Sequence, residues 1–180
     1  MGIRRVVTGH SSNGKAIVAS DEVVEPVQAT MLPGYEFYRL WGADAPPALP
    51  DAGAQPANRA YFPPVGGFRF GLFTVPPETT VAVEDIDFEV ALAEIEAALP
   101  GMAVHMEPEH PGMHTTASVD FEFVVSGSIV LELDDGTEVE LHPGDTVVQN
   151  GTRHAWRNRG SEPCQMVVVL VGAPHANVHI

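Results

Sequence analysis

The sequence predicts an all-β protein, built as a sandwich or a closed barrel. From residue 114 onward the pattern is that of short strands, separated by turn-forming residues at close, even spacing. Only one stretch of the 180 residues has the periodicity of a helix. A closed barrel or a double sheet also removes the exposed strand edges that such a chain would otherwise present.

Strands are expected in both parts of the chain. In the N-terminal part they are 15–20, 35–42 and 67–79, with the Ala/Pro-rich loop 43–60 before the third and a stop at Pro76-Pro77. In the C-terminal part we expect strands at 118–125, 128–134, 137–141, 145–149, 154–158 and 165–172. Asp134-Asp135-Gly136 is a hairpin signal, and the segment His142-Pro143-Gly144-Asp145 is a turn.

One helix is expected at about 85–99, with a structural packing role. Either Asp85 or Asp87 can cap its start, and Pro100-Gly101 ends it. The apolar side chains that fall on one face of this helix are Phe88, Leu92, Ile95 and Leu99.

Composition excludes several classes of partner. The net charge of -15, with Lys15 as the single lysine, argues against binding to nucleic acid or to an anionic membrane. No apolar run is long enough to span a bilayer, and the N-terminus lacks the apolar core of a secretory signal. A single cysteine, Cys164, rules out an intramolecular disulfide, fits a cytoplasmic location, and is expected to be a small apolar residue beside a strand.

Two segments carry a family resemblance. The first reads His114, Thr115, Thr116, three residues, Asp120, six residues and Gly127. The second reads Gly144-Asp145, Gln149-Asn150-Gly151, His154, three residues and Asn158. Together they resemble the two motifs of the cupin family, whose first motif has a second histidine where Thr116 stands and a glutamate where Asp120 stands.

The resemblance covers roughly residues 104–172 and implies a cupin double-stranded β-helix, or jelly-roll barrel. Residues 1–103 are then an extension of strands, loop and helix that packs on this barrel core, and residues 173–180 are a C-terminal tail. The resemblance also implies a homodimer and a small-molecule substrate in the barrel. Its metal would lie between His114, Asp120 and His154, as iron, zinc, manganese or nickel.

The chemistry of these residues is consistent with a metal, because imidazoles bind first-row transition metals well and two histidines with one carboxylate leave open positions. On an extended strand His114, Thr116, Asp120 and Glu122 share one face. Glu122 is therefore an alternative to the shorter Asp120 as the functional carboxylate. Without a metal, His114 or His154 with either carboxylate would form a general acid/base pair tuned by burial.

Other residues near the motifs have lesser expected roles. Thr116, Gln149 and Trp156 are candidates for substrate binding, and Gln149 is also a candidate to orient His154. Arg153, Arg157 and Arg159 are expected to balance nearby acids, although Arg157 at the barrel mouth would favour a carboxylate-bearing substrate. Of the remaining histidines, His110 lies close enough to reach the rim.

Three functions remain open from the sequence. The first is a cytoplasmic, metal-dependent dioxygenase, lyase or isomerase in which His114, Asp120, Glu122 and His154 carry the chemistry. The second is a metal-free dehydratase, decarboxylase or isomerase that uses histidine and a carboxylate. The third is a non-catalytic small-molecule binder.

Overall fold

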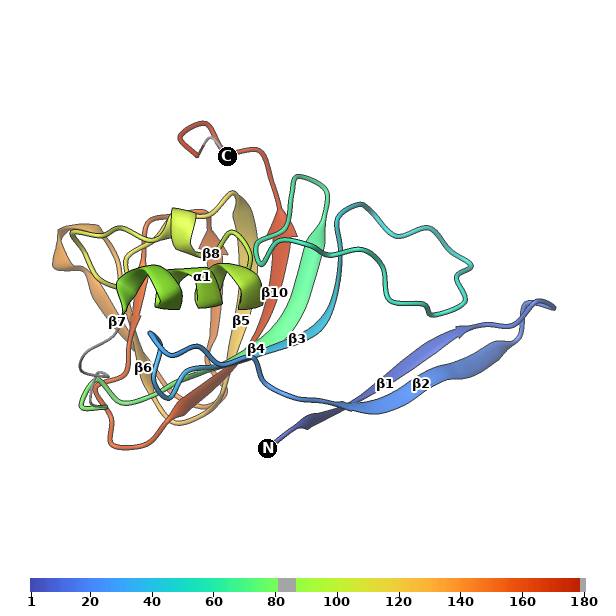
Figure 1. The fold of residues 1–180 in the computed structure, drawn as a ribbon, viewed down its shortest axis with the longest axis horizontal. Coiled ribbons are helices and arrows are strands. Elements are labelled where there is room, and N and C mark those ends of the chain that lie inside the picture. The colour runs from blue at the N-terminus through green and yellow to red at the C-terminus, as the bar shows by residue number, and fades with distance from the viewer. Residues whose placement is uncertain (81–86, 179–180) are drawn as a thin grey trace.

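The computed structural model describes residues 1–80 and 87–178 (Figure 1). The strands are β1 (Ile3–His10), β2 (Ala16–Val24), β3 (Glu36–Ala43), β4 (Phe68–Val75), β5 (Ser118–Ser126), β6 (Ile129–Glu132), β7 (Glu138–Leu141), β8 (Thr146–Asn150), β9 (Ala155–Arg157) and β10 (Cys164–Gly172). The helical elements are α1 (Phe88–Ala98) and the 3-10 turns η1 (Ala103–His105) and η2 (Asp134–Gly136).

Two antiparallel sheets form the body of the molecule. The larger has the order β3-β4-β10-β5-β8 and the smaller the order β7-β6-β9. The apolar core lies between them, with Val124, Ile129, Met166 and Cys164 at most 1% exposed. This arrangement confirms the expected all-β jelly-roll barrel. Two of its strands, β3 and β4, come from the N-terminal part of the chain.

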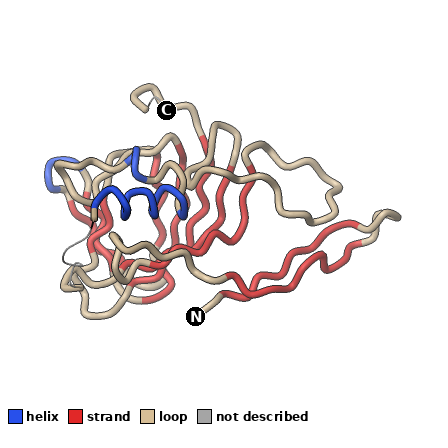
Figure 2. The backbone as a smooth tube through the Cα atoms, in the orientation of Figure 1, coloured by secondary structure: helices blue, strands red, loops and turns tan. Residues whose placement is uncertain are grey.

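The hairpin of β1 and β2 stands apart from this body. It forms its own two-stranded sheet and extends away from the barrel (Figures 1 and 2). The sequence patterns missed β1 and cut β2 short, since 15–20 was expected and Ala16–Val24 is found. The physical reason is that both faces of the hairpin are largely solvated, so the alternation of buried and polar residues that marks a strand is absent.

Strand β5 has the reverse of the usual pattern of side chains. Its buried, inward positions include Asp120 and Glu122. Phe121 and Phe123, which alternate with them, point outward and are 49% and 44% exposed. Pairing with β10 and β8 fixes this register, with Asp120 opposite Leu170 and Gln149. Since a shift of one residue would exchange the two faces, the register decides that carboxyls line the interior.

Helix α1 begins after Asp87, whose carboxylate accepts hydrogen bonds from the N–H groups of Glu89 and Val90. The alternative cap, Asp85, lies outside the described residues. The expected apolar face is partly wrong. Ile95 and Leu99 are buried, but Phe88 and Leu92 are 63% and 39% exposed, because the helix contacts the barrel along a narrower stripe that includes Ala91.

Residues 44–67 form a long loop that returns to the barrel. Arg69 anchors it by donating hydrogen bonds to the Ala60 carbonyl at 3.0 Å and the Asp44 carboxylate at 2.6 Å. At its far end the Tyr61 N–H donates to the Pro100 carbonyl at 2.8 Å. The loop thereby brings Tyr61 and Phe62 onto the core. Among the described residues, no helix is both long and apolar enough to cross a bilayer.

The buried stripe of α1 gives a stability prediction. Leu99→Ala is expected to lower the free energy of unfolding by roughly 2–5 kcal/mol, because it leaves a cavity under a fully buried side chain. The matched change Leu92→Ala, on the solvated side, should cost less than about 1 kcal/mol. Urea unfolding of both variants measures the difference, and equal losses would contradict the orientation of the helix.

Candidate functional site

Two histidines from distant segments lie face to face. His114 and His154 form an isolated antiparallel bridge in which each N–H donates to the other carbonyl, at 2.9 and 3.0 Å. Their ring centroids are 4.2 Å apart. His154 is 2% exposed. The structure therefore brings together the first histidine of one motif and the histidine of the other, as the motifs require.

Backbone carbonyls fix the orientation of both rings. The Nδ1 of His114 lies 3.0 Å from the Gly112 carbonyl, and the Nδ1 of His154 lies 2.9 Å from that of Thr152. A carbonyl can only accept, so each Nδ1 carries the proton and each Nε2 keeps its lone pair. Burial lowers the pKa of His114, and burial together with His114 lowers the pKa of His154 to about 3. Both imidazoles are thus neutral near pH 7.

Gln149 supports this arrangement through Thr152. Its amide donates to the Thr152 carbonyl at 3.0 Å and to the Thr152 hydroxyl at 2.6 Å. That carbonyl is the same one that accepts from His154. Gln149 therefore holds the segment that orients His154, and its side-chain amide is occupied by these bonds.

Asp120 and Glu122 are the most unusual groups in the interior. They are 3% and 5% exposed. Within the described part of the chain, Oδ1 of Asp120 and Oε2 of Glu122 have no hydrogen-bond partner. Burial raises the pKa of Asp120 to about 6, and burial together with Asp120 raises the pKa of Glu122 well above its ordinary value. Both carboxyls therefore hold a proton more readily than exposed carboxylates do.

Thr116 and Trp156 also lie in the interior. Thr116 is 1% exposed and its hydroxyl accepts a hydrogen bond from Ser118 at 3.0 Å. Trp156 meets the ring of His154 edge-on at 5.8 Å and packs against the core. These contacts place both side chains beside the site, and their expected role in substrate binding stays a prediction.

A metal centre needs more ligands than the two histidines. In residues 1–80 and 87–178, no three His, Cys, Asp or Glu side chains gather closely enough to hold an ion. Catalytic metal centres usually have three protein ligands, so the described residues do not form a complete one. The set of His114, Asp120 and His154 stays a prediction, and no step below depends on a metal.

Two aromatic residues of the site, Tyr61 and Phe62, were missed by the sequence patterns. Phe62 stacks edge-on against His105 at 4.6 Å and lies 6.3 Å from the ring of His114. Next to it, Tyr61 has a pKa raised by burial and by the charges of Asp120 and Glu122. A usable signal was the cluster Tyr61-Phe62-Pro63-Pro64, which ends a polar loop with large apolar residues.

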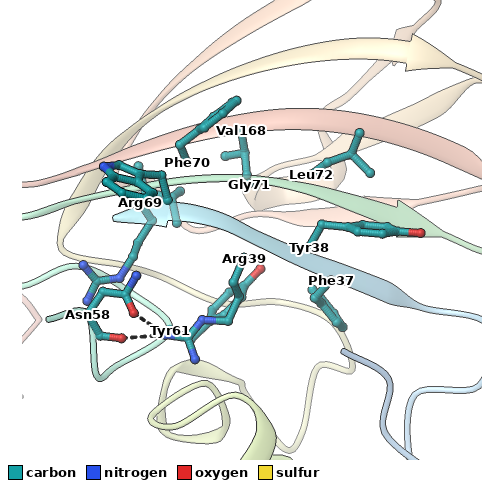
Figure 3. A pocket seen from close by; sticks show the side chains of 12 residues that line it. Phe37, Tyr38, Arg39, Asn58, Tyr61, Arg69, Phe70, Gly71, Leu72 and Val168 are labelled. Atoms are coloured by element: carbon teal, nitrogen blue, oxygen red, sulfur yellow. Dashed lines mark hydrogen bonds between the residues drawn. The ribbon is translucent and has the colours of Figure 1, made fainter. Parts of the chain in front are cut away.

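A narrow pocket lies beside Tyr61, along the edge strand β3. Figure 3 shows Arg39 next to Tyr61, with the guanidinium donating a hydrogen bond to the Asn58 carbonyl at 2.7 Å. The pocket lining also includes Val168 and Leu170, which are the cross-strand partners of Glu122 and Asp120. The pocket therefore runs alongside the sheet that carries the carboxyl pair.

The arginines near the second motif pair with acids. Arg153 donates to Glu107 at 2.7 Å and to Asp134 at 2.9 Å, and Arg157 donates to Glu132 at 2.6 Å. Arg159 pairs with Glu138. These contacts agree with the expected charge balancing. Arg153 and Arg157, with Glu107 and Glu132, line an open, polar cleft that also contains His110.

The pKa of His154 gives a testable dependence of stability on pH. The ordinary pKa of histidine is 6.5. Below pH 6.5 His154 therefore becomes protonated in the unfolded chain, whereas in the folded chain it stays neutral until about pH 3. Between pH 7 and pH 4.5 this is expected to lower the free energy of unfolding by roughly 2–3 kcal/mol.

His154→Gln should remove the loss of unfolding free energy that the wild type shows between pH 7 and pH 4.5. Urea unfolding of chelator-treated wild type and variant at the two pH values measures it. If the variant loses as much stability on acidification as the wild type, the neutral, buried state of His154 is refuted.

Comparisons with known proteins agree with the motifs. Residues 102–170 match the family model described as "Cupin domain". Phomopsin biosynthesis cluster protein C' from Diaporthe leptostromiformis is 45% identical over 67 residues, 34% of this chain and 35% of that protein. The match thus spans about a third of the length of such relatives. The cupin-domain-containing oxidoreductase srdB from Neurospora crassa is 24% identical over 173 residues, 93% of this chain and 72% of that protein.

Solved structures with cupin in their descriptions, or with a related description, are similar to the chain at lower identity. A Cupin 2 conserved barrel domain protein from Salinispora arenicola is 18% identical with a TM-score of 0.43, covering 81% of this chain and 82% of that one. A protein from Thermotoga maritima described as a predicted oxalate decarboxylase is 16% identical with a TM-score of 0.44, covering 83% and 93%. With its two motifs and the family match, the segment 102–170 belongs to the cupin superfamily.

Proposed function

We propose that this protein is a cupin enzyme that transfers protons on a small organic molecule bound in the barrel. The observation that carries the proposal is the pair of buried carboxyls on β5, Asp120 and Glu122, each with an oxygen that no described group satisfies. An unpaired buried polar atom costs free energy, and a bound substrate would satisfy it.

The two carboxyls are suited to opposite roles. Asp120, with a pKa of about 6, is largely ionised at neutral pH and can act as a general base. Glu122 has a higher pKa than usual because of burial and the charge of Asp120, and it can act as a general acid. Two residues apart on one strand face, they are separated by roughly 7 Å along the backbone. This spacing would let both carboxyls contact different atoms of one small substrate.

The reaction class follows from these roles. Asp120 would remove a proton from a carbon activated by a neighbouring carbonyl, and Glu122 would donate a proton to an oxygen of the same substrate. A dehydration or an isomerisation needs both transfers, whereas a decarboxylation needs only the donation of a proton to the carbon that loses CO2. The Nε2 atoms of His114 and His154 would accept hydrogen bonds from the substrate. An enzymatic role is supported by the relatives named as cupin-domain-containing oxidoreductases.

A metal-dependent reaction is the second candidate, and one observation favours it. Both histidines are neutral, with Nδ1 fixed by a carbonyl and Nε2 left with its lone pair. Histidines that bind metals have this arrangement. Iron, zinc, manganese or nickel would suit such ligands, and the ion would act as a Lewis acid toward substrate. A third protein ligand would have to approach the pair on binding.

Proton transfer can be tested before the natural substrate is known. Incubation in D2O with a panel of small hydroxy-carbonyl compounds, followed by mass spectrometry, detects catalysed exchange of carbon-bound hydrogen for deuterium. We expect exchange to persist after exhaustive chelation and to fall by roughly 10²–10⁴-fold in Asp120→Asn. The control Glu140→Gln, in an exposed carboxylate, should leave it unchanged.

Other results would assign a different role. Exchange that disappears on chelation and returns with one added metal ion would favour the second candidate and reject the first. Thermal stabilisation by a panel compound with no exchange or turnover would indicate a non-catalytic binder. The cytoplasmic location inferred from the single cysteine stays part of the proposal.

A further inference from the structure

Arg39 is the one partly buried arginine that has no acidic partner among the residues that the structure describes. Six of the eight arginines form ion pairs with carboxylates. They include Arg157, the sequence candidate for binding a substrate carboxylate, which donates to Glu132 and to the Pro111 carbonyl. Arg59 is exposed, whereas Arg39 is half-buried. A cation partly removed from water costs free energy unless an anion compensates it, so this position favours a bound anion.

The guanidinium of Arg39 is held by one nitrogen and keeps the other two available. Its Nη2 donates to the Asn58 carbonyl at 2.7 Å and makes longer contacts with the carbonyls of Arg59 and Ala60. Within the described part of the chain, Nε and Nη1 have no hydrogen-bond acceptor. These two nitrogens carry three of the five N–H donors of a guanidinium. Figure 3 shows this side chain beside Tyr61, where the free donors can meet a ligand.

The register of the larger sheet places Arg39 on the same face as the buried carboxyls. Arg39 pairs with Gly71, which pairs with Val168. Val168 in turn pairs with Glu122. Residues directly opposite each other on neighbouring strands share one face. Three strand spacings of about 4.8 Å separate the backbones of Arg39 and Glu122 by roughly 14 Å. Since Gly71 has no side chain and Val168 is apolar, a cation and an acid stand at the two ends of an apolar row.

Tyr61 connects the Arg39 end of this row with the proposed catalytic site. Its ring lines the same pocket as Arg39 and packs edge-on against Phe62 at 4.9 Å. Phe62 in turn lies 6.3 Å from the ring of His114. Burial raises the pKa of Tyr61, the charge of Arg39 opposes this rise, and the charges of the carboxyl pair on β5 add to it. Tyr61 is therefore close to the cation on one side and to the two acids on the other.

The pocket at Arg39 suits the head group of an organic acid. Its volume is about 20 Å³, which is room for one small polar group. A planar carboxylate matches the planar donors of a guanidinium. Burial and the charge of Arg69 lower the pKa of Arg39, and a bound anion would oppose both effects. The lining also includes the apolar side chains Phe37, Val168 and Leu170, which suit an apolar body next to the carboxylate.

We propose that Arg39 binds the carboxylate of an organic acid, and that this acid is the substrate of the carboxyl pair. The binding site does not depend on the proposed function, whereas the identity of the acid as substrate rests on it. The apolar body of the acid would lie along Gly71 and Val168, with its hydroxy-carbonyl group at the carboxyls of β5. Since the pocket has room for the head group alone, the Tyr61 ring has to turn aside for this body to pass.

Binding of acids and of their primary amides to the full-length wild type tests the site. Calorimetric titration would use hydroxycarboxylic acids with alkyl or aromatic bodies, from lactate to hydroxyoctanoate and phenyllactate, each compared with its amide. At least one acid should bind roughly 10–100-fold more tightly than its amide, because the amide loses charge-assisted hydrogen bonds. The absence of this preference in every pair overturns the proposal. Displacement of the acid by an equal concentration of inorganic phosphate also overturns it, because it indicates a general anion site.

Variants assign the preference to Arg39. Arg39→Gln should remove the preference for the acid, and Arg39→Lys, which keeps the charge without the planar donors, should retain part of it. The matched control Arg59→Gln changes an exposed arginine that also lacks an acidic partner among the described residues, and it should bind the acid as the wild type does. Thermal unfolding without ligand shows which variants are folded. A full preference for the acid in folded Arg39→Gln refutes the assignment. If Arg39→Gln does not fold, an unchanged preference in Arg39→Lys refutes it instead.

Hydrogen exchange in D2O separates this proposal from the proposed function. For an acid that binds, Arg39→Gln should raise the KM of exchange by roughly 10–100-fold and change kcat little, because the carboxylate contact is remote from the reacting carbon. Equal exchange with the acid and its amide, in wild type and variant, overturns the acid as substrate while the proposed function holds. An acid that binds through Arg39 without exchange supports the binding site and counts against the proposed function.

Discussion

The alternation of side chains along β5 is the constraint on which the rest of the molecule depends. One strand presents Asp120 and Glu122 to the interior and Phe121 and Phe123 to the exterior. Hydrogen bonding to β10 on one side and β8 on the other prevents it from slipping by one residue. The same register therefore creates the buried acidic pair and the apolar outer surface.

Two acids in an apolar interior destabilise the fold unless something compensates them. Protonation supplies part of the compensation, which is why burial moves both pKa values upward. The remainder comes from dense packing of Met166, Val124 and Ile129 around the sheet. Proteins retain such costly groups where function uses them, and the perturbed pair is a stronger functional indication than the spacing of the motifs alone.

Much of this could be read from the sequence, since short strands, turn residues and the spacing of His114, Asp120 and His154 depend on local geometry. The inward direction of Glu122 followed from parity with Asp120. The contact of Tyr61 and Phe62 with the site could not be predicted, because a long loop brings them there. No local sequence pattern shows that this loop packs back on the barrel. The exposed side of α1 could not be predicted either. Its contact with the barrel decides which residues are buried, and its own periodicity does not.

The buried carboxyl pair and the exposed apolar side chains Phe121 and Val148 lie on opposite faces of the same sheet. Among the described strands, β8 lies at the edge of the sheet and pairs with β5 alone. It carries Gln149, which bonds to Thr152, and the Thr152 carbonyl in turn orients His154. An edge strand of five residues with one solvent-exposed face unfolds locally at a low free-energy cost. Loss of the pairing between β8 and β5 would therefore release Gln149 and, through Thr152, the ring of His154, so the edge strand controls the position of the histidine pair.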